Sequence, residues 1–253
     1  MIIVSVLRQS KDFTAKHAQW LSKQIKGHRF ICLTDAKHIP GVETAPLLYD
    51  WPGWWAKIEL FNPNHPIIGK EDILYFDIDT VITGDISELA KVKNFTMLND
   101  FSEANSECPA PASGVMFIPA DKKHLAWEKF NSDPDAIINS NCPPPYHGDQ
   151  GFIGSVYKNA DRWQNILPRK IISYKVDIAT KDMIGFNPSL SFGSSTGKVP
   201  LDAVVVCFHG NPRPWKTGFS WVPTFSLKEK VCGKLKGLKL KLKSLSLKND
   251  PIR

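Results

Sequence analysis

The chain has 253 residues, 42% of them hydrophobic, which is enough apolar material for one α/β domain with a sizeable core. Its formal net charge is +7, but residues 226–253 carry nine Lys or Arg and two acidic residues, so residues 1–225 sum to zero. Proteins that bind nucleic acid usually carry basic residues around a cleft, so the neutral charge of residues 1–225 argues against a nucleic-acid partner. No apolar run approaches the roughly 18 residues of a membrane-spanning helix.

The first residues and the cysteines give expectations about location. Residues 1–7 are mostly apolar and have no basic segment before them, so we expect a first β-strand and not a signal peptide. The five cysteines are scattered, without the paired spacing of a metal site: Cys32, Cys108, Cys142, Cys207 and Cys232. This odd, scattered set indicates free thiols and a reducing, cytoplasmic setting.

Strand and helix patterns alternate along residues 1–225. Periodicity and turn residues predict strands at 2–7, 28–34, 73–77, 95–99, 114–118 and 204–208. They predict helices at 13–26, 54–61 and 121–130, and a further helix entered from residues 147–151. This alternation predicts an α/β fold with a mixed, mostly parallel sheet flanked by helices, which binds ligands at the carboxyl ends of its strands.

The strand predicted at 73–77 leads into Phe76-Asp77-Ile78-Asp79. Because side chains alternate along a strand, we expect Asp77 and Asp79 on the same face. Two neighbouring carboxylates repel each other unless a divalent cation lies between them, and such oxygen ligands suit Mg²⁺ or Mn²⁺, which in turn bind phosphates. Taken alone, a D-x-D segment is more often a pair of solvated turn residues.

Two later segments place polar residues at the ends of apolar runs. Asp149-Gln150 stands in a glycine-flanked turn before an apolar helix, where an ordinary N-cap is the simpler interpretation. The strand at 204–208 delivers His209 into a loop that carries Arg213 and Lys216. An imidazole there would complete a metal site, and the two cations would neutralise a diphosphate. A lone histidine after a strand is more often structural.

Four segments in chain order carry a resemblance to a known family. They are the D-x-D block from Tyr75 to Leu89, the strand Ser113-Gly114-Val115-Met116, the turn Asp149-Gln150, and the end of the strand at 204–208 with its loop. Together they resemble motifs of the family-8 glycosyltransferases, the group of glycogenin and the bacterial lipo-oligosaccharide galactosyltransferases. The resemblance covers about residues 55–215.

The resemblance implies a GT-A fold for residues 1–225, as a catalytic domain followed by a basic amphipathic tail at 226–253. The implied activity is metal-dependent transfer of a hexose from a nucleotide sugar, with UDP as the expected nucleotide, to a glycan or lipid-linked acceptor with retention of configuration. Mn²⁺, or Mg²⁺, is the implied cofactor, and Asp77, Asp79 and His209 are the implied metal ligands. Asp149 and Gln150 are the implied catalytic residues, facing the donor sugar. Donor contacts are implied for Lys57, Asp77, Arg213 and Lys216.

Three departures from the family pattern bear on these assignments. Ala112 replaces the asparagine that precedes Ser113 in the family motif. The loop after His209 is two residues shorter than in the family, with Arg213 in place of the lysine. Residues 4–8 match no family motif, so nucleotide contact there rests on fold analogy alone.

Two other classes of function stay open at this point. The segment Asp77-Ile78-Asp79-Thr80-Val81 also resembles the first motif of haloacid-dehalogenase-type phosphatases, with Asp77 as the nucleophile and Asp79 as the acid/base. That motif normally opens the chain, whereas here two β/α units precede it. The second alternative is a catalytically dead sugar-binding protein, for which Ala112 is the argument.

The tail and a tryptophan cluster add two further expectations. Five apolar residues of the tail fall on one helical stripe among lysines: Val231, Leu235, Leu238, Leu242 and Leu245. A basic amphipathic helix favours anionic membranes, so we expect a cytoplasmic protein that is peripheral on the inner face of the membrane; a solvated basic extension is the alternative.

Trp51, Trp54 and Trp55 are candidates for stacking on a sugar, although core packing is expected for at least one of them.

Overall fold

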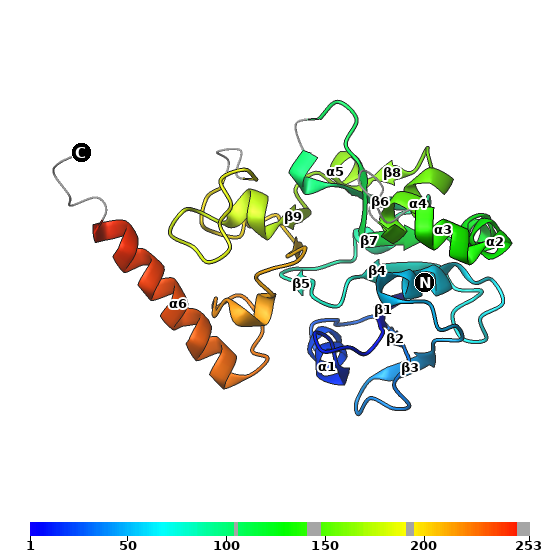
Figure 1. The fold of residues 1–253 in the computed structure, drawn as a ribbon, viewed down its shortest axis with the longest axis horizontal. Coiled ribbons are helices and arrows are strands. Elements are labelled where there is room, and N and C mark those ends of the chain that lie inside the picture. The colour runs from blue at the N-terminus through cyan, green and yellow to red at the C-terminus, as the bar shows by residue number, and fades with distance from the viewer. Residues whose placement is uncertain (104–105, 141–147, 191–194, 247–253) are drawn as a thin grey trace. The chain divides into compact units, whose positions relative to one another are not determined.

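The computed structural model describes residues 1–103, 106–140, 148–190 and 195–246, which form two compact units (Figure 1). Unit 1 consists of Met1–Ile78 and Ile86–Pro168, and unit 2 consists of Asp79–Asp85 and Arg169–Arg253. The boundary therefore crosses the D-x-D segment. Asp77 belongs to unit 1 and Asp79 to unit 2.

Unit 1 is built on a seven-stranded sheet. In spatial order its strands are β3 (Glu43–Pro46), β2 (Phe30–Thr34), β1 (Ile2–Leu7), β4 (Ile73–Phe76), β7 (Pro111–Ile118), β6 (Thr96–Asn99) and β8 (Asp161–Arg162). The first four strands are parallel, β7 runs antiparallel to both β4 and β6, and β8 is parallel to β6. The mixed, mostly parallel sheet predicted from the sequence is thus confirmed.

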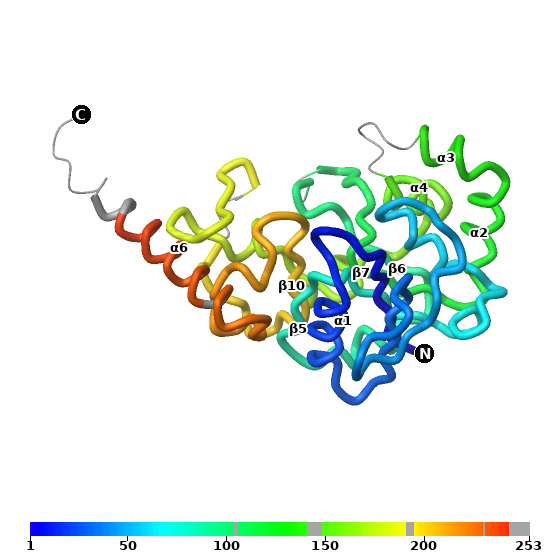
Figure 2. Tube along the Cα trace, turned by 60° about the horizontal axis from the view of Figure 1, so that its bottom comes forward, coloured from blue at the N-terminus to red at the C-terminus, as the bar shows by residue number. Residues whose placement is uncertain are grey.

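Helices cover this sheet and complete its core. The helices of unit 1 are α1 (Ala15–Ser22), α2 (Lys123–Ser132), α3 (Pro134–Ser140), α4 (Gly148–Val156) and α5 (Trp163–Ile166), with 3₁₀ turns η1 (Gly53–Phe61), η2 (Leu89–Lys91), η3 (Phe101–Glu103) and η4 (Ala120–Lys122). Figures 1 and 2 show α2, α3 and α4 grouped together. η1, α2 and α4 share a hydrophobic core with β1 and β4, whose strand residues are almost all buried, as expected for central strands covered on both faces.

Element boundaries differ from the prediction where a local hydrogen bond decides them. The helix predicted at 13–26 begins only at Ala15, because Thr14 is its N-cap and donates its N–H to Nδ1 of His17 at 2.9 Å. It ends at Ser22, and single turns lead on to Gly27, whose φ of +73° lies in the left-handed region. The strand predicted at 73–77 ends at Phe76.

Unit 2 contains a separate three-stranded sheet. Its strands, in spatial order, are β5 (Val81–Ile82), β10 (Val205–Cys207) and β9 (Ile171–Ser173). Its helical elements are the single π-turn η5 (Tyr174–Ile178), the 3₁₀ turn η6 (Pro214–Lys216) and the long helix α6 (Leu227–Ser246). The strand predicted at 204–208 is therefore observed as β10. It lies in the middle of this second sheet and not in the main sheet of unit 1.

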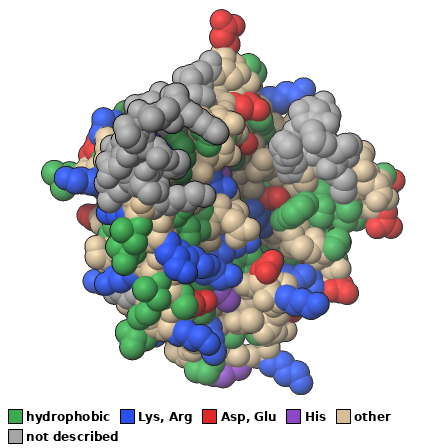
Figure 3. Space-filling model, turned by 60° about the vertical axis from the view of Figure 1, so that its left-hand side comes forward, with side chains coloured by type: hydrophobic (Ala, Val, Ile, Leu, Met, Phe, Trp, Pro, Cys, Tyr) green, Lys and Arg blue, Asp and Glu red, His purple; other side chains and the backbone are tan. Residues whose placement is uncertain are grey.

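Helix α6 packs on η6 at its start and presents an apolar stripe farther along. At Gly233 an added Cβ would lie 2.5 Å from the backbone at Thr217 and Gly218, so the glycine permits close contact. Four residues of the predicted stripe, Val231, Leu235, Leu238 and Leu242, are each more than half exposed, as is Leu227 at the start of the helix. Figure 3 brings this side of the molecule forward and shows apolar side chains beside Lys and Arg. The side chain of Leu245 lies outside the described part. Within the described ranges, no helix combines the length and apolarity needed to cross a bilayer.

Candidate functional site

A cavity of about 300 Å³ in unit 1 brings together residues from four segments of the chain. Its lining residues are Trp54, Lys57, Asp77, Ser113, Gly148, Asp149 and Gln150. Trp54 and Lys57 come from η1, Asp77 follows β4, Ser113 belongs to β7, and the last three open helix α4. Because β4 and β7 are hydrogen-bonded neighbours and α4 packs on β7, the fold itself places these side chains around one space.

Lys57 lies between the two carboxylates of this cavity. Its Nζ is 3.0 Å from Oδ1 of Asp77 and 3.3 Å from Oδ2 of Asp149. It also donates a hydrogen bond to Oγ of Ser113 at 3.1 Å, and that hydroxyl donates in turn to Asp149 Oδ2 at 2.7 Å. The hydroxyl of Tyr75 donates to Asp77 Oδ1 at 2.5 Å. The network fixes both carboxylates and leaves the cluster with one net negative charge.

Burial controls the protonation of this cluster. The side chains of Lys57 and Asp149 are only 13% and 7% exposed. Burial raises the pKa of Asp149 above its ordinary value, while the Lys57 ammonium and the Ser113 hydrogen bond oppose that rise. Burial alone would lower the pKa of Lys57, but Asp149 and Asp77 together raise it above its ordinary value. Lys57 is therefore held as a cation, and its charge favours the ionised form of Asp149 against the effect of burial.

The two aspartates of the D-x-D segment do not continue the alternation of β4. The strand ends at Phe76, and Ile78 and Asp79 form a turn before β5. Because neither aspartate lies on the strand, the alternation of strand side chains does not place Asp77 and Asp79 on one face. The expectation that they continue β4 was wrong. The backbone N–H of Asp77 still bonds to the carbonyl of Gly114, which holds Asp77 against β7.

Asp79 belongs to a second cluster, in unit 2. Its Oδ2 accepts a short hydrogen bond from Nη1 of Arg213, and the two side chains are 11% and 22% exposed. Lys175 lies close enough for both groups to affect it: burial and Arg213 lower the pKa of Lys175, and Asp79 raises it. This cluster thus holds one carboxylate and two cations, a balance suited to an anionic ligand.

His209 is held by the same cluster through its backbone. Nζ of Lys175 donates to the carbonyl of His209 at 2.9 Å, and the imidazole Nε2 is 2.6 Å from Oγ of Ser173. The φ angle of His209 is +28°, an uncommon conformation for a residue other than glycine. Such strain concentrates at functional sites. Lys216, at the end of η6, is exposed.

The carboxylates and the imidazole expected to bind a metal are chemically suited to Mn²⁺. Across the part of the chain that the structure describes, no group of three or more His, Cys, Asp or Glu side chains is arranged to hold a metal ion. Asp79 instead has Arg213 as its partner, and Asp77 has Lys57. The carboxylate and imidazole groups are thus the kinds of ligand that Mn²⁺ prefers, but Arg213 occupies Asp79 and would compete with the ion for it.

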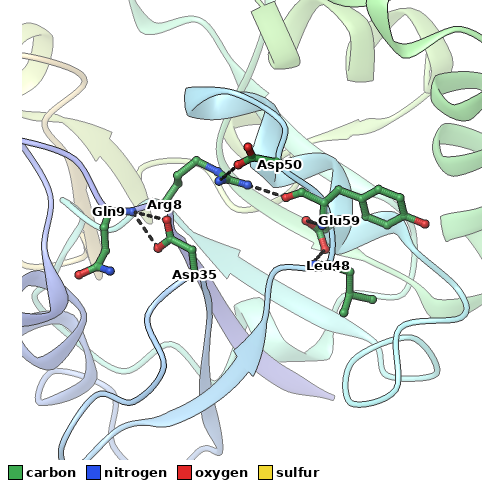
Figure 4. Close-up of polar contacts among 7 residues, drawn as sticks. Arg8, Gln9, Asp35, Leu48, Asp50 and Glu59 are labelled. Carbon is green, nitrogen blue, oxygen red and sulfur yellow. Dashed lines mark hydrogen bonds and ion pairs between the residues drawn. The ribbon is translucent and has the colours of Figure 1, made fainter.

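The carboxyl ends of β1 and β2 carry a further polar cluster (Figure 4). Arg8, just after β1, donates from Nη1 to Asp50 Oδ1 at 2.6 Å and from Nη2 to the carbonyl of Tyr49. The N–H of Gln9 bonds to Asp35, just after β2, at 3.0 Å. These contacts tie the loops that follow β1, β2 and β3 to one another, at the edge where ligands of such sheets bind. Fold analogy remains the basis for nucleotide contact by residues 4–8.

Three residues of these clusters were not assigned a role from the sequence. Tyr75 lies two residues before Asp77, a spacing that places two side chains on the same face of a strand, and its hydroxyl bonds to Asp77. Ser113 lies within the segment that resembles the family strand, yet its bridge between Lys57 and Asp149 depends on tertiary structure. Lys175 has no neighbouring motif, and only the packing of η5 brings it to His209.

Comparisons with known proteins show the fold. No protein-family model matches the sequence, and no curated protein matches it. Among solved structures, the galactosyltransferase LgtC, in complex with donor and acceptor sugar analogues, is similar with a TM-score of 0.52 and 12% identity over 96% of each chain. The glycosyltransferase GlyE of Streptococcus pneumoniae has a TM-score of 0.54 and 13% identity over 98% of this chain and 63% of its own. The bifunctional glycosyltransferase WbbM has a TM-score of 0.52 and 12% identity, over 95% of this chain and 51% of its own. These likenesses confirm the predicted GT-A fold.

Proposed function

We propose that this chain, which has the GT-A fold of glycosyltransferases, moves a hexose from a nucleotide sugar to a glycan or lipid-linked acceptor. A UDP-sugar is the proposed donor, and retention of configuration is the proposed outcome. The observation that carries the proposal is the cavity that unites Lys57, Asp77, Asp149 and Gln150 on this fold. A space of about 300 Å³ walled by fixed polar groups matches the size of small-molecule sites.

Each residue of the cavity has a proposed role. Asp149 and Gln150 face the anomeric carbon of the donor, and Asp77 and Lys57 contact its sugar or ribose. In the reaction the bond between the anomeric carbon and the diphosphate oxygen breaks, and its electrons leave with the diphosphate. The acceptor hydroxyl oxygen forms the new bond to that carbon, and its proton passes to the departing diphosphate. Lys57 favours the anionic form of Asp149, whose negative charge would stabilise positive charge on the sugar ring.

The residues of unit 2 are proposed to bind the diphosphate. Arg213 and Lys216 neutralise its charge, as a guanidinium and an ammonium do at many phosphate sites. Asp77, Asp79 and His209 are the proposed ligands of Mn²⁺ or Mg²⁺, which when bound would supply further positive charge beside the leaving group. Under this proposal Arg213 would exchange Asp79 for phosphate, which would leave the Asp79 carboxylate available to hold the ion.

A turnover assay tests the proposed reaction. The wild type with Mn²⁺ is expected to release UDP from at least one UDP-hexose, and Asp149→Asn is expected to lower that rate by about 100-fold or more, as removal of a group that stabilises transition-state charge does. Asp202→Asn, which changes an exposed aspartate paired with Arg169, is the matched control and should leave the rate unchanged. Hydrolysis of sugar phosphates without release of UDP would instead favour the phosphatase alternative.

The alternatives receive no support from the features described. The three solved structures above are all glycosyltransferases. Asp77, the nucleophile in the phosphatase reading, is bonded to Lys57 and Tyr75. Ala112, the argument for a dead protein, does not line the cavity, whereas its neighbour Ser113 does.

Helix α6 is proposed to bind an anionic membrane surface, which makes the protein peripheral on the inner face of the cytoplasmic membrane. Its exposed apolar stripe has lysines on both sides, and each lysine near an anionic bilayer contributes about 1 kcal/mol. Among the described residues Cys32, Cys108 and Cys232 are free thiols, which supports a reducing compartment, while Cys142 lies outside the described residues.

Sedimentation with vesicles that contain anionic lipid tests this assignment. The full-length protein is expected to partition into the vesicle pellet, less so at high salt, and the double variant Leu235→Ser, Leu238→Ser to lose most of that binding. Leu201→Ser is the matched control, since Leu201 is a fully exposed leucine outside α6. Equal, salt-insensitive partitioning of all three forms would exclude a role for the stripe.

A further inference from the structure

Of the three neighbouring tryptophans, Trp54 alone is strongly exposed. Trp55 is 3% exposed and stacks on Phe130, with ring centroids 5.5 Å apart. Trp51 is half-buried and stacks on Tyr49 at 4.5 Å. The side chain of Trp54 is 59% exposed and lines the cavity of unit 1. The core therefore accounts for Trp51 and Trp55 but not for Trp54.

The backbone of Gly148 is shaped to receive the Trp54 indole. Gly148 has a φ of +58°, and a Cβ added there would lie 2.2 Å from Trp54 Nε1. Any other residue would displace the ring, so the glycine and the indole form a matched pair. Gly148 immediately precedes Asp149, and the indole lines the same cavity as the carboxylate that Lys57 holds.

The cavity wall combines one aromatic surface with a set of polar groups. Besides the indole, the cavity is lined by five polar side chains: Lys57, Asp77, Ser113, Asp149 and Gln150. A pyranose ring has the complementary character, because its C–H groups form an apolar face and its hydroxyls project around the rim. A flat indole removes much apolar surface from water at a small cost in side-chain entropy, and charged and amide groups bind hydroxyls with defined geometry.

We propose that Trp54 binds the apolar face of a pyranose ring, whose hydroxyls bond to the polar wall of the cavity. This inference rests on the proposed function in its choice of ligand, and it adds a sugar-binding residue that the motifs do not contain. The ring is that of the donor hexose or of the acceptor sugar. Both present the same face to an indole, and the ligands tested below distinguish them.

Fluorine NMR of the full-length protein labelled with fluorotryptophan tests the proposal. The Trp54 signal is assigned by its absence in Trp54→Phe, and the Trp51 signal, assigned through Trp51→Phe, is the internal control. UDP, UDP-hexoses, methyl hexosides and disaccharides are added at millimolar concentration. We expect the Trp54 signal to shift with a sugar-bearing ligand, not with UDP, and the Trp51 signal to stay in place.

Two arms then assign the ring. If UDP-hexoses shift the signal, Trp54→Ala should lower UDP-hexose affinity by roughly tenfold or more, as truncation of an aromatic anchor does, and leave UDP affinity unchanged. If free saccharides shift it without nucleotide, the ring is that of the acceptor. Trp54→Phe should retain part of the affinity in either case.

Two results would overturn the proposal: no sugar-bearing ligand shifts the Trp54 signal, or UDP alone shifts it as much. Failure of the proposed function looks different. In that case saccharides shift the signal while neither UDP nor any UDP-hexose binds, and Trp54 remains a sugar-binding residue without a nucleotide-sugar donor.

Discussion

Replacement of Lys57 by Met is expected to lower the free energy of unfolding by about 3–5 kcal/mol at neutral pH, the usual cost of removing one partner from a buried ion pair. Lys57 is the shared counter-ion of Asp77 and Asp149 and is itself 13% exposed. Without its ammonium, the buried carboxylate of Asp149 keeps the Ser113 hydroxyl as its hydrogen-bond donor among the described residues. Chemical denaturation of wild type and Lys57→Met measures the effect.

The loss should depend on pH with a defined sign. Burial raises the pKa of Asp149 in the folded protein, and removal of Lys57 takes away the main opposing influence. The folded variant then binds a proton that the unfolded chain has already released, so its stability falls as pH rises through the folded pKa. The gap between wild type and variant should be smallest at a pH below the folded pKa of Asp149 in both proteins, and it should widen as pH rises above the wild-type value.

Two further variants make this prediction specific. Lys57→Arg keeps a cation beside both carboxylates and should retain most of the stability. Asp149→Asn added to Lys57→Met removes the unpaired charge and should restore part of what the single variant loses. A loss that is independent of pH, or equal in Lys57→Arg and Lys57→Met, would show that Lys57 acts through its packing and not through its charge.

Arg213→Gln is expected to change two affinities in opposite directions. Arg213 donates to Asp79, which is also a proposed metal ligand. Removal of its charge should raise the affinity for Mn²⁺ measured without nucleotide, because no guanidinium then competes for the carboxylate. It should lower UDP affinity in the presence of Mn²⁺ by roughly tenfold or more, the effect of one lost charge-assisted hydrogen bond to phosphate.

Arg169→Gln is the matched control for this result. Arg169 also pairs with an aspartate, Asp202, at 2.9 Å, but both side chains are well exposed. Exposed pairs contribute little, so neither affinity should change. Calorimetric titration of Mn²⁺ and of UDP measures both quantities. If Arg213→Gln weakens Mn²⁺ binding, Arg213 does not compete with the ion.

The fold was largely predictable because its core strands have strong local signals. β1 is apolar apart from Ser5 and β4 is a continuous apolar run, and both strands were predicted within one residue of their observed ends. The boundaries of α1 were less accurate, since the Thr14–His17 hydrogen bond and Gly27 decide them. The assignment of β10 to a second sheet depends on pairing with β5 and β9, which no local pattern records.

The cavity residues were predictable only where a motif marked them. Lys57, Asp77, Asp149 and Gln150 were all proposed from the resemblance, and the structure brings them together around one space. Ser113 and Trp54 acquire their positions from contacts across the fold. Trp54 in particular was one of three equivalent candidates until burial separated it from Trp51 and Trp55.

Binding of UDP measured by calorimetry, with Mn²⁺ and with EDTA, tests the central claim of a nucleotide-sugar site most directly. The wild type is expected to bind UDP with Mn²⁺ and to lose that binding in EDTA. Asp79→Ala should not bind UDP under either condition, while Asp202→Ala, which changes an exposed carboxylate, should behave as wild type. A wild-type protein that binds no UDP in either condition would contradict the proposed donor and turn attention to hydrolysis of sugar phosphates.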